Sequence, residues 1–328
     1  MLKIQIDRLA ALGYSAKGGS ELEYYLFKDS FAAAREKNYE DLETFGWYIE
    51  DYHMLQGTKE EGINASVRRH MNQSGIPVEF SKGEWGPGQH ELNLRYAETL
   101  EMADRQAIYK QGFKEIALSQ DLSVSFMAKW RSDLAGSSMH LHLSLWDQEG
   151  RSAFAGGEES DTFRHFLGGW IHHARAIAPF YAPYPNSYKR YAYQSWAPTR
   201  IAWSRDNRTA GFRIVGTGDS QRIECRLPGA DANPYLAYAA ALAAGIDGLK
   251  NKIDPPPIFS GDVYQAQDLP TVPANLGEAV AGLDQSTMLR QAFGDHVVDH
   301  YVHFFRTEER KFNEAVTSWE RTRYFERG

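Results

Sequence analysis

The chain has 328 residues, 42% hydrophobic and 24% charged, which is typical of a folded globular protein. Its net charge of −7 argues against nucleic acid as a partner, and no apolar stretch approaches the roughly 18 residues of a membrane span. The single cysteine, Cys225, excludes an internal disulfide and fits a reducing compartment, so a cytoplasmic protein without a membrane partner is expected.

The predicted elements alternate between helices and short strands. Apolar spacing predicts helices over 1–12, 58–74, 98–119, 163–177, 233–248 and 295–321. A capping box from Thr58 to Glu61 opens the second of these, and Gly75 and Pro77 end it. Strands are expected over 20–27, 78–81, 90–96, 123–128, 139–146, 199–204, 210–215 and 221–227. Most loops are too short for parallel crossovers, so the expected fold class is α+β, with a largely antiparallel sheet and flanking helices.

Three predicted strands carry charged or imidazole side chains on one face. Glu21 and Glu23 alternate with apolar residues, so both carboxylates point to the same side of their strand. The alternation recurs in later strands with His140 and His142, and with Arg222, Glu224 and Arg226. A solvated outer face explains any one such strand, but the repetition on three strands favours a site that binds something charged.

The glycine-rich stretch from Lys82 to Glu91 adds two carboxylates, those of Glu84 and Glu91. Oxygen ligands in this number favour a hard divalent ion, Mg²⁺ or Mn²⁺, over Zn²⁺. Six candidate ligands are more than one ion needs, so two ions are expected. The candidate ligands are Glu21, Glu23, Glu84, Glu91, His140 and Glu224.

Arginines are concentrated in one segment of this acidic chain, and they are Arg190, Arg200, Arg205, Arg208, Arg213, Arg222 and Arg226. Guanidinium groups bind phosphate or carboxylate through paired hydrogen bonds. Surface ion pairs are the favoured interpretation for Arg200 and Arg205. Arginines beside divalent ions suit transfer of a γ-phosphoryl group, so an enzyme is the leading hypothesis.

Together these motifs resemble the catalytic region of glutamine synthetase and of its relatives that join glutamate to organic amines, whose fold is similar to that of guanidino kinases. The resemblance runs along the whole chain. Its motifs are ELEYYLF from Glu21, GPGQHE from Gly86, GSSMHLH from Gly136, NSYKR from Asn186, DNRTA from Asp206, RIECR from Arg222 and NPYL from Asn233.

The resemblance implies a role for each matched position. One metal would be held by Glu23, Glu84 and Glu91, and the other by Glu21, His140 and Glu224. The phosphates of ATP and the transferred group would meet Arg208, Arg213 and Arg222, of which Arg208 and Arg213 would be catalytic. The nucleotide would lie along Tyr96, His142 and Ser144. The carboxylates of glutamate would be held by Gly136, Arg190 and Arg226.

The resemblance also implies the reaction and the assembly. ATP phosphorylates the γ-carboxylate of glutamate, and a neutral amine then displaces phosphate to leave an amide. Family members form homo-oligomeric rings, dodecamers among them, in which a neighbour's N-terminal β-grasp domain completes each active site. The expected organisation here is one catalytic domain over residues 1–328 without that domain, so assembly and activity of the chain by itself stay open.

Two departures from the glutamine synthetase pattern bear on the amine. Trp196 lies where glutamine synthetase has a flap glutamate that takes a proton from ammonium, and Ala135 replaces an asparagine before Gly136. Tryptophan cannot accept a proton, but it offers an apolar wall and a ring face for a cationic amine. These departures favour an organic amine, such as ethanolamine, a polyamine or an alkylamine, over ammonia.

Two alternatives remain beside the glutamate–amine ligase. One is glutamine synthetase itself, using ammonia, and the other is a non-catalytic relative that acts as a scaffold or sensor. Intact metal-ligand positions count against the second. Tyr264 lies near the place of a regulatory tyrosine in some bacterial members, but its surroundings differ, and it is expected to be an ordinary loop residue.

Overall fold

The computed structural model describes residues 1–327, which fold around a nine-stranded sheet. The main path of the sheet runs β2-β3-β1-β6-β9-β8-β7, and β4 and β5 also pair with β1. Every pairing is antiparallel except that of β7 with β8, which confirms the expected fold class. The strands are β1 (Tyr14–Phe27), β2 (Val78–Gly83), β3 (Gln89–Leu94), β4 (Ala97–Glu98), β5 (Ser123–Ser125), β6 (Met139–Asp147), β7 (Trp203–Arg205), β8 (Phe212–Val215) and β9 (Arg222–Cys225).

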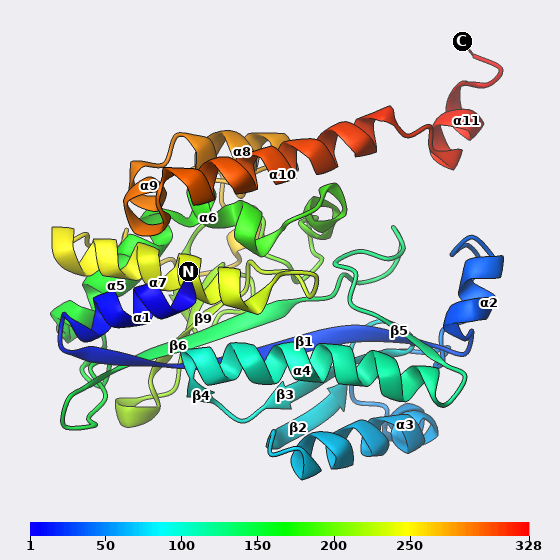
Figure 1. The fold of residues 1–328 in the computed structure, drawn as a ribbon, viewed down its shortest axis with the longest axis horizontal. Coiled ribbons are helices and arrows are strands. Elements are labelled where there is room, and N and C mark those ends of the chain that lie inside the picture. The colour runs from blue at the N-terminus through cyan, green and yellow to red at the C-terminus, as the bar shows by residue number, and fades with distance from the viewer. Residues whose placement is uncertain (328) are drawn as a thin grey trace.

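Helices lie along the sheet (Figure 1), and apolar side chains of the strands form the main core with them. On β1, Leu22, Tyr24 and Leu26 belong to the main hydrophobic core, and the Tyr24 ring meets Phe113 of α4 edge to face at 4.5 Å. The helices are α1 (Leu2–Ala10), α2 (Phe31–Glu36), α3 (Met54–Gln73), α4 (Thr99–Leu118), α5 (Asp161–His172), α6 (Ala174–Tyr181), α7 (Pro234–Asn251), α8 (Leu276–Asp284), α9 (Thr287–Phe293), α10 (Asp295–Glu314) and α11 (Ser318–Tyr324).

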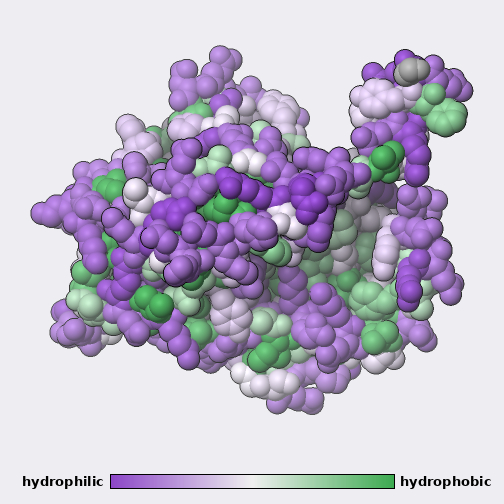
Figure 2. Space-filling model, turned by 45° about the horizontal axis from the view of Figure 1, so that its top comes forward, coloured by the Kyte–Doolittle hydropathy of each residue, from purple (hydrophilic) through white to green (hydrophobic). Residues whose placement is uncertain are grey.

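The outer surface is mainly hydrophilic, and it is hollowed beneath the C-terminal segment, where hydrophobic residues are visible (Figure 2). The last helix, α11, projects away from the other helices at that end of the molecule (Figure 1). Within residues 1–327, none of the helices combines the length and the apolar composition that a membrane crossing needs.

The predicted start of the second helix is wrong. Helix α3 begins at Met54, one turn before the expected capping box, and the Thr58 hydroxyl donates to the Met54 carbonyl at 2.9 Å instead of capping the helix. Glu60 therefore lies inside the helix, where it is fully buried. Tertiary contacts outweigh the local capping signal here.

Two long predicted helices are each divided. The apolar period over 163–177 continues without a break, but α5 ends at His172 and α6 begins at Ala174. The predicted last helix ends at Glu314, and Thr317 caps α11 by accepting a hydrogen bond from the Glu320 backbone at 3.2 Å. The spacing of apolar residues shows which residues are buried. That spacing stays the same when one helix ends and another begins between two buried residues, so it does not reveal the break.

Candidate active site

Strand register brings the predicted ligands onto one face of the sheet. Glu21 of β1 lies opposite His140 of β6, and Glu23 lies opposite Glu91 of β3. His142 and Glu224 oppose each other across β6 and β9. The charged and imidazole side chains that alternate along each strand therefore form one continuous patch. Residues that lie opposite each other on paired antiparallel strands point to the same face of the sheet.

The first predicted metal set lies together in the structure. Ligand atoms of Glu23, Glu84 and Glu91 are within 4.8 Å of one another. The Ser138 amide donates to Glu23 Oε2 at 2.7 Å, and Asn93 Nδ2 donates to Glu91 Oε1 at 2.7 Å, so the two buried carboxylates are held in place by neighbours. This arrangement of oxygen donors fits a hard divalent cation.

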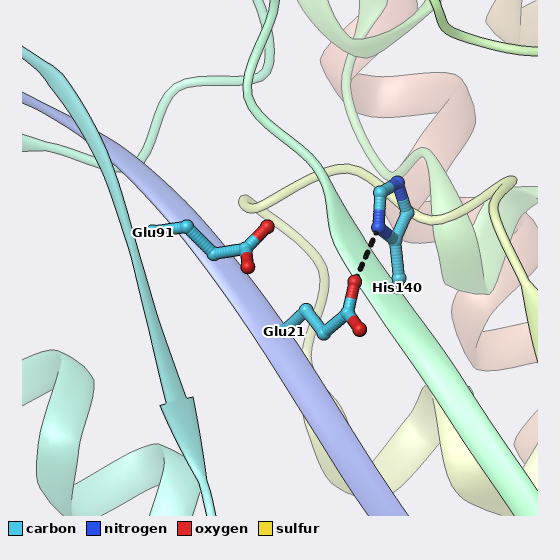
Figure 3. A group of neighbouring side chains, drawn as sticks. All are labelled: Glu21, Glu91 and His140. Atoms are coloured by element: carbon cyan, nitrogen blue, oxygen red, sulfur yellow. Dashed lines mark hydrogen bonds and ion pairs between the residues drawn. The ribbon is translucent and has the colours of Figure 1, made fainter. Parts of the chain in front are cut away.

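The second predicted set is also assembled, and it overlaps the first. Glu21 Oε2 is 2.9 Å from His140 Nδ1. Glu91 comes from β3, on the other side of β1 from β6, and forms a group with these two residues (Figure 3). Glu224 Oε1 is 3.6 Å from the same imidazole nitrogen. His142, expected only along the nucleotide, places Nε2 at 2.8 Å from Glu21 Oε1 and forms a group with Glu21 and Glu224. The structure therefore joins all six candidate ligands in one cluster.

The pKa values of the crowded carboxylates show that this part of the cluster lacks positive charge. Burial and the nearby Glu84 carboxylate raise the pKa of Glu23 to about 7. Burial and the charge of Glu21 raise the pKa of Glu91 well above its usual value. Carboxylates in this arrangement repel one another, and a divalent cation would relieve the repulsion.

The imidazole and the carboxylate on the other side are already in ligand form. Burial and the charge of Arg226 lower the pKa of His140 to about 4, so its ring is neutral near pH 7 and offers a lone pair to a metal. Burial opposes ionisation of Glu224, but Arg226 and His140 outweigh it and lower its pKa to about 2. The donor set as a whole fits the divalent ions that the sequence predicts.

Three of the predicted arginines border the cluster. Arg213 donates to Glu224 Oε2 at 2.8 Å, and Arg226 donates to Glu224 Oε1 at 2.6 Å. Arg222 Nε lies 3.2 Å from His142 Nδ1. Arg208 is exposed on the turn after β7 and contacts none of these groups, so its contact with phosphate stays a prediction.

The two arginines expected in surface ion pairs differ. Arg205 pairs with Glu158, as expected. Arg200 donates instead to the Leu269 carbonyl at 3.0 Å, so the ion pair expected for it is wrong. Its carbonyl partner lies far along the chain, where the local sequence gives no signal of the contact.

A cavity of about 450 Å³ opens beside the cluster, and Tyr96, His142, Ser144 and Arg222 line it as predicted for a nucleotide site. Lys17 and Trp146 also line it, with Lys17 Nζ 3.6 Å from the Trp146 ring centroid. These two residues were missed by the sequence reasoning. Lys17 keeps the two-residue period of Glu21 and Glu23 on β1, and that signal would have found it.

The predicted glutamate-binding residues lie beside the first carboxylate set. Arg190 is 1% exposed, lies 3.3 Å from Ser138 Oγ and also donates to the carbonyls of Arg226 and Leu227. A Cβ at Gly136 would overlap the Arg190 side chain, which explains the glycine by close approach. Nε of Arg190 and Nε of Arg226 are buried and have no hydrogen-bond partner within residues 1–327.

Trp196 lies on a flap formed by residues 191–198. Gln194 and Trp196 have left-handed backbone angles, with φ of 55° and 61°, and the Trp196 side chain is 54% exposed. Ser195 ties the flap to the Arg190 carbonyl at 3.0 Å. Tyr264 was expected to be an ordinary loop residue, but its hydroxyl donates to the Ala197 carbonyl at 2.7 Å and anchors the flap.

Comparison with known proteins places these features in one family. A family model described as glutamine synthetase, catalytic domain, matches residues 1–324. The chain is 45% identical over 328 residues to a γ-glutamylethanolamide synthetase, GlnA4, of Streptomyces coelicolor, covering 100% of this chain and 71% of that protein. It is 36% identical over 333 residues to a glutamate–isopropylamine ligase of a Pseudomonas species, covering 99% and 72%.

Solved structures give the same result. A GmaS/ADP complex superimposes with a TM-score of 0.90 at 31% identity, over 99% of this chain and 76% of that one. GmaS without ligand superimposes with a TM-score of 0.87 at 30% identity, over 99% and 75%.

Divalent-metal affinity should depend on pH through Glu23. A ligand carboxyl must lose its proton to bind a metal, so Mn²⁺ affinity falls as pH falls through about 7, the pKa of Glu23. Calorimetric titration with Mn²⁺ at pH 8 and pH 6 should give a dissociation constant about tenfold higher at pH 6 for one displaced proton. Any residual Mn²⁺ binding by a Glu23→Gln variant should lose that pH step. Equal affinities at the two pH values in the unsubstituted chain would contradict the assignment.

Proposed function

The chain belongs to the glutamine synthetase family through its catalytic domain, and from this premise we propose that it is an ATP-dependent ligase joining the γ-carboxylate of glutamate to an organic amine. The observation that carries the proposal is the cluster of five glutamates and His140 beside a cavity of about 450 Å³. The non-catalytic alternative does not explain why so many mutually repelling carboxylates are kept in place.

The proposed first step uses both ends of the cluster. ATP lies in the cavity with its phosphates toward Arg213 and Arg222, and Arg190 with Arg226 holds glutamate beside Glu23. The two carboxylate sets would hold two divalent ions, Mg²⁺ or Mn²⁺, whose positive charge would offset that of the phosphates. A γ-carboxylate oxygen attacks the γ-phosphorus, the bond to ADP breaks, and γ-glutamyl phosphate results.

In the second step an amine reacts with the acyl phosphate, and water must be kept away from that intermediate. The neutral amine nitrogen attacks the acyl carbon, the carbon–oxygen bond to phosphate breaks, and the nitrogen passes a proton to the departing phosphate to leave the amide. The flap around Trp196 shields the acyl phosphate, and Tyr264 holds the flap in position. Trp196 places an indole ring where glutamine synthetase has a proton acceptor. The ring favours an amine with an apolar part over ammonium.

Similarity supports the organic amine. Among the relatives, the two described above are named for ethanolamide formation and for isopropylamine ligation, and a glutamine synthetase of Pyrococcus abyssi is 35% identical, below both. The proposed substrate is a short primary amine.

The proposed enzyme acts in the cytoplasm as a homo-oligomeric ring. Exposed aromatic residues near the end of the chain support self-association, since Trp319 is 63% and Phe325 is 86% exposed. The proposal includes no nucleic-acid or membrane partner, in keeping with the net charge of −7.

Direct assay tests the proposed reaction. With ATP, Mg²⁺ and glutamate, phosphate release should depend on ethanolamine or isopropylamine more than on ammonia, and mass spectrometry should identify the γ-glutamyl amide. The expected preference is tenfold or more, in the range of about 10–200-fold that one apolar contact surface provides. Greater turnover with ammonia would contradict the choice of amine, and absence of ATP-dependent turnover with any amine would contradict the ligase itself.

Trp196→Glu tests the source of amine preference. A carboxylate at this place can accept a proton from ammonium, so the ratio of kcat/KM for ammonia to kcat/KM for ethanolamine should rise about tenfold or more. Tyr39→Glu is the matched control, because Tyr39 is a similarly exposed aromatic residue, 66% exposed, that follows α2 and has no part in the flap. If the ratio is the same in the two variants, Trp196 does not set the preference.

Tyr264→Phe tests the anchoring of the flap. Loss of one hydrogen bond, worth about 0.5–1.5 kcal/mol, should loosen the flap and raise phosphate release without amine by about 2- to 10-fold. Tyr235→Phe is the control, because its hydroxyl donates to Asp104 away from the flap. An unchanged ratio of phosphate released to amide formed would show that Tyr264 does not position the flap.

A further inference from the structure

A second group of buried ionisable residues lies on the other side of β3 from Glu91. It consists of Glu50 from the loop before α3, Glu60 from α3 and His90 from β3. None of the three is more than 3% exposed. His90 and Glu91 are neighbours on a strand, so their side chains point to opposite faces, and this group is separate from the active-site carboxylates.

The polar atoms of this group are poorly satisfied. Glu50 Oε1 accepts a hydrogen bond from the Gly88 amide at 3.2 Å. The His90 ring approaches Glu60 and lies 3.9 Å from Glu50 Oε2, but neither contact has hydrogen-bond geometry. Glu50 Oε2, both carboxylate oxygens of Glu60 and His90 Nε2 therefore have no hydrogen-bond partner within residues 1–327.

At most one positive charge in the described chain faces these two carboxylates. Across residues 1–327, His90 is the only basic side chain within ion-pair distance of Glu50 or Glu60. Two buried carboxylates that share at most one cation keep an uncompensated charge, which is destabilising. A single proton shared between them would satisfy one pair of oxygens and leave the other oxygens and the imidazole nitrogen without partners.

The donor atoms are arranged as ligands. One atom from each of Glu50, Glu60 and His90 lies within 4.8 Å of the others. Asn64 Nδ2 donates toward His90 Nδ1 at 3.3 Å, and Asn64 Oδ1 accepts a hydrogen bond from Tyr24 at 2.8 Å, so the side of the ring away from the carboxylates is held in place. A Cβ at Gly46 would overlap the Glu50 and Glu60 carboxylates, and glycine leaves that space free.

We propose that Glu50, Glu60 and His90 form a further divalent-cation site, distinct from the active-site cluster. Two carboxylates and one imidazole are ligands that Mn²⁺ accepts. The bound ion joins the loop before α3 and helix α3 to strand β3, which follows later in the chain.

The site has a consequence for the active site. The backbone amides of Glu50 and Asp51 donate to the Glu84 carbonyl at 3.1 and 2.9 Å. An ion that fixes Glu50 therefore also fixes the backbone of Glu84, one of the candidate active-site ligands. The proposed ion is a structural support for that ligand and takes no part in the reaction.

Metal analysis of three proteins tests the site. The unsubstituted chain, Glu60→Gln and Glu61→Gln are loaded with Mn²⁺, desalted, and measured by mass spectrometry of the metal. Glu61 is the matched control, since it follows Glu60 on α3 but pairs with Arg68 at the surface. Glu60→Gln should retain about one ion per chain fewer than the other two, as a single site requires. Equal Mn²⁺ content in all three would overturn the proposal.

A second measurement does not depend on the folding of a variant. Crystals of the unsubstituted chain grown with Mn²⁺ should show an anomalous difference peak at roughly 2.0–2.2 Å from Glu50, Glu60 and His90. A map with peaks at the active-site cluster and none here would overturn the proposal. These outcomes are independent of the amine that the enzyme uses, because neither measurement involves turnover.

Discussion

Repulsion among buried carboxylates is the constraint on which the rest of this molecule depends. Register between β1 and its neighbours places Glu21, Glu23 and Glu91 on one face, and a slip of one residue would turn them into the apolar core. The register is held by the opposite face, where Leu22, Tyr24 and Leu26 pack against the helices. Hydrophobic burial on one side of the sheet thus offsets the cost of concentrating charge on the other.

The cluster is compensated differently at its two ends. Around Glu224, fixed guanidinium groups hold the carboxylate ionised, with a pKa of about 2. Around Glu23 the protein supplies too little positive charge, and the pKa rises to about 7. At one end the arginines therefore keep Glu224 ionised before any ion binds, whereas at the other end the carboxylates need a cation to be stable together in ionised form. This difference suits a site that binds phosphate beside arginines and takes up metal with its substrates.

Specificity for the amine is separated from this rigid sheet. The flap around Trp196 is a short loop with two left-handed residues, and its anchors are a few hydrogen bonds from Ser195 and Tyr264. Loops of this kind tolerate substitution, since little of the core depends on them. The carboxylate cluster thus rests on paired strands, whereas the proposed choice of amine rests on a segment that can vary without disturbing them.

The sequence by itself determined the strands, the antiparallel class and the face on which Glu21, Glu23, His140, His142 and Glu224 lie, because side-chain alternation is a property of the local backbone. Tertiary structure alone decided that α3 begins at Met54, that Arg208 stays apart from the cluster, and that Glu50, Glu60 and His90 meet. Those three residues come from a loop, a helix and a strand with no common period. Their contact and their burial depend on how separate segments pack against one another. No local sequence pattern records that packing.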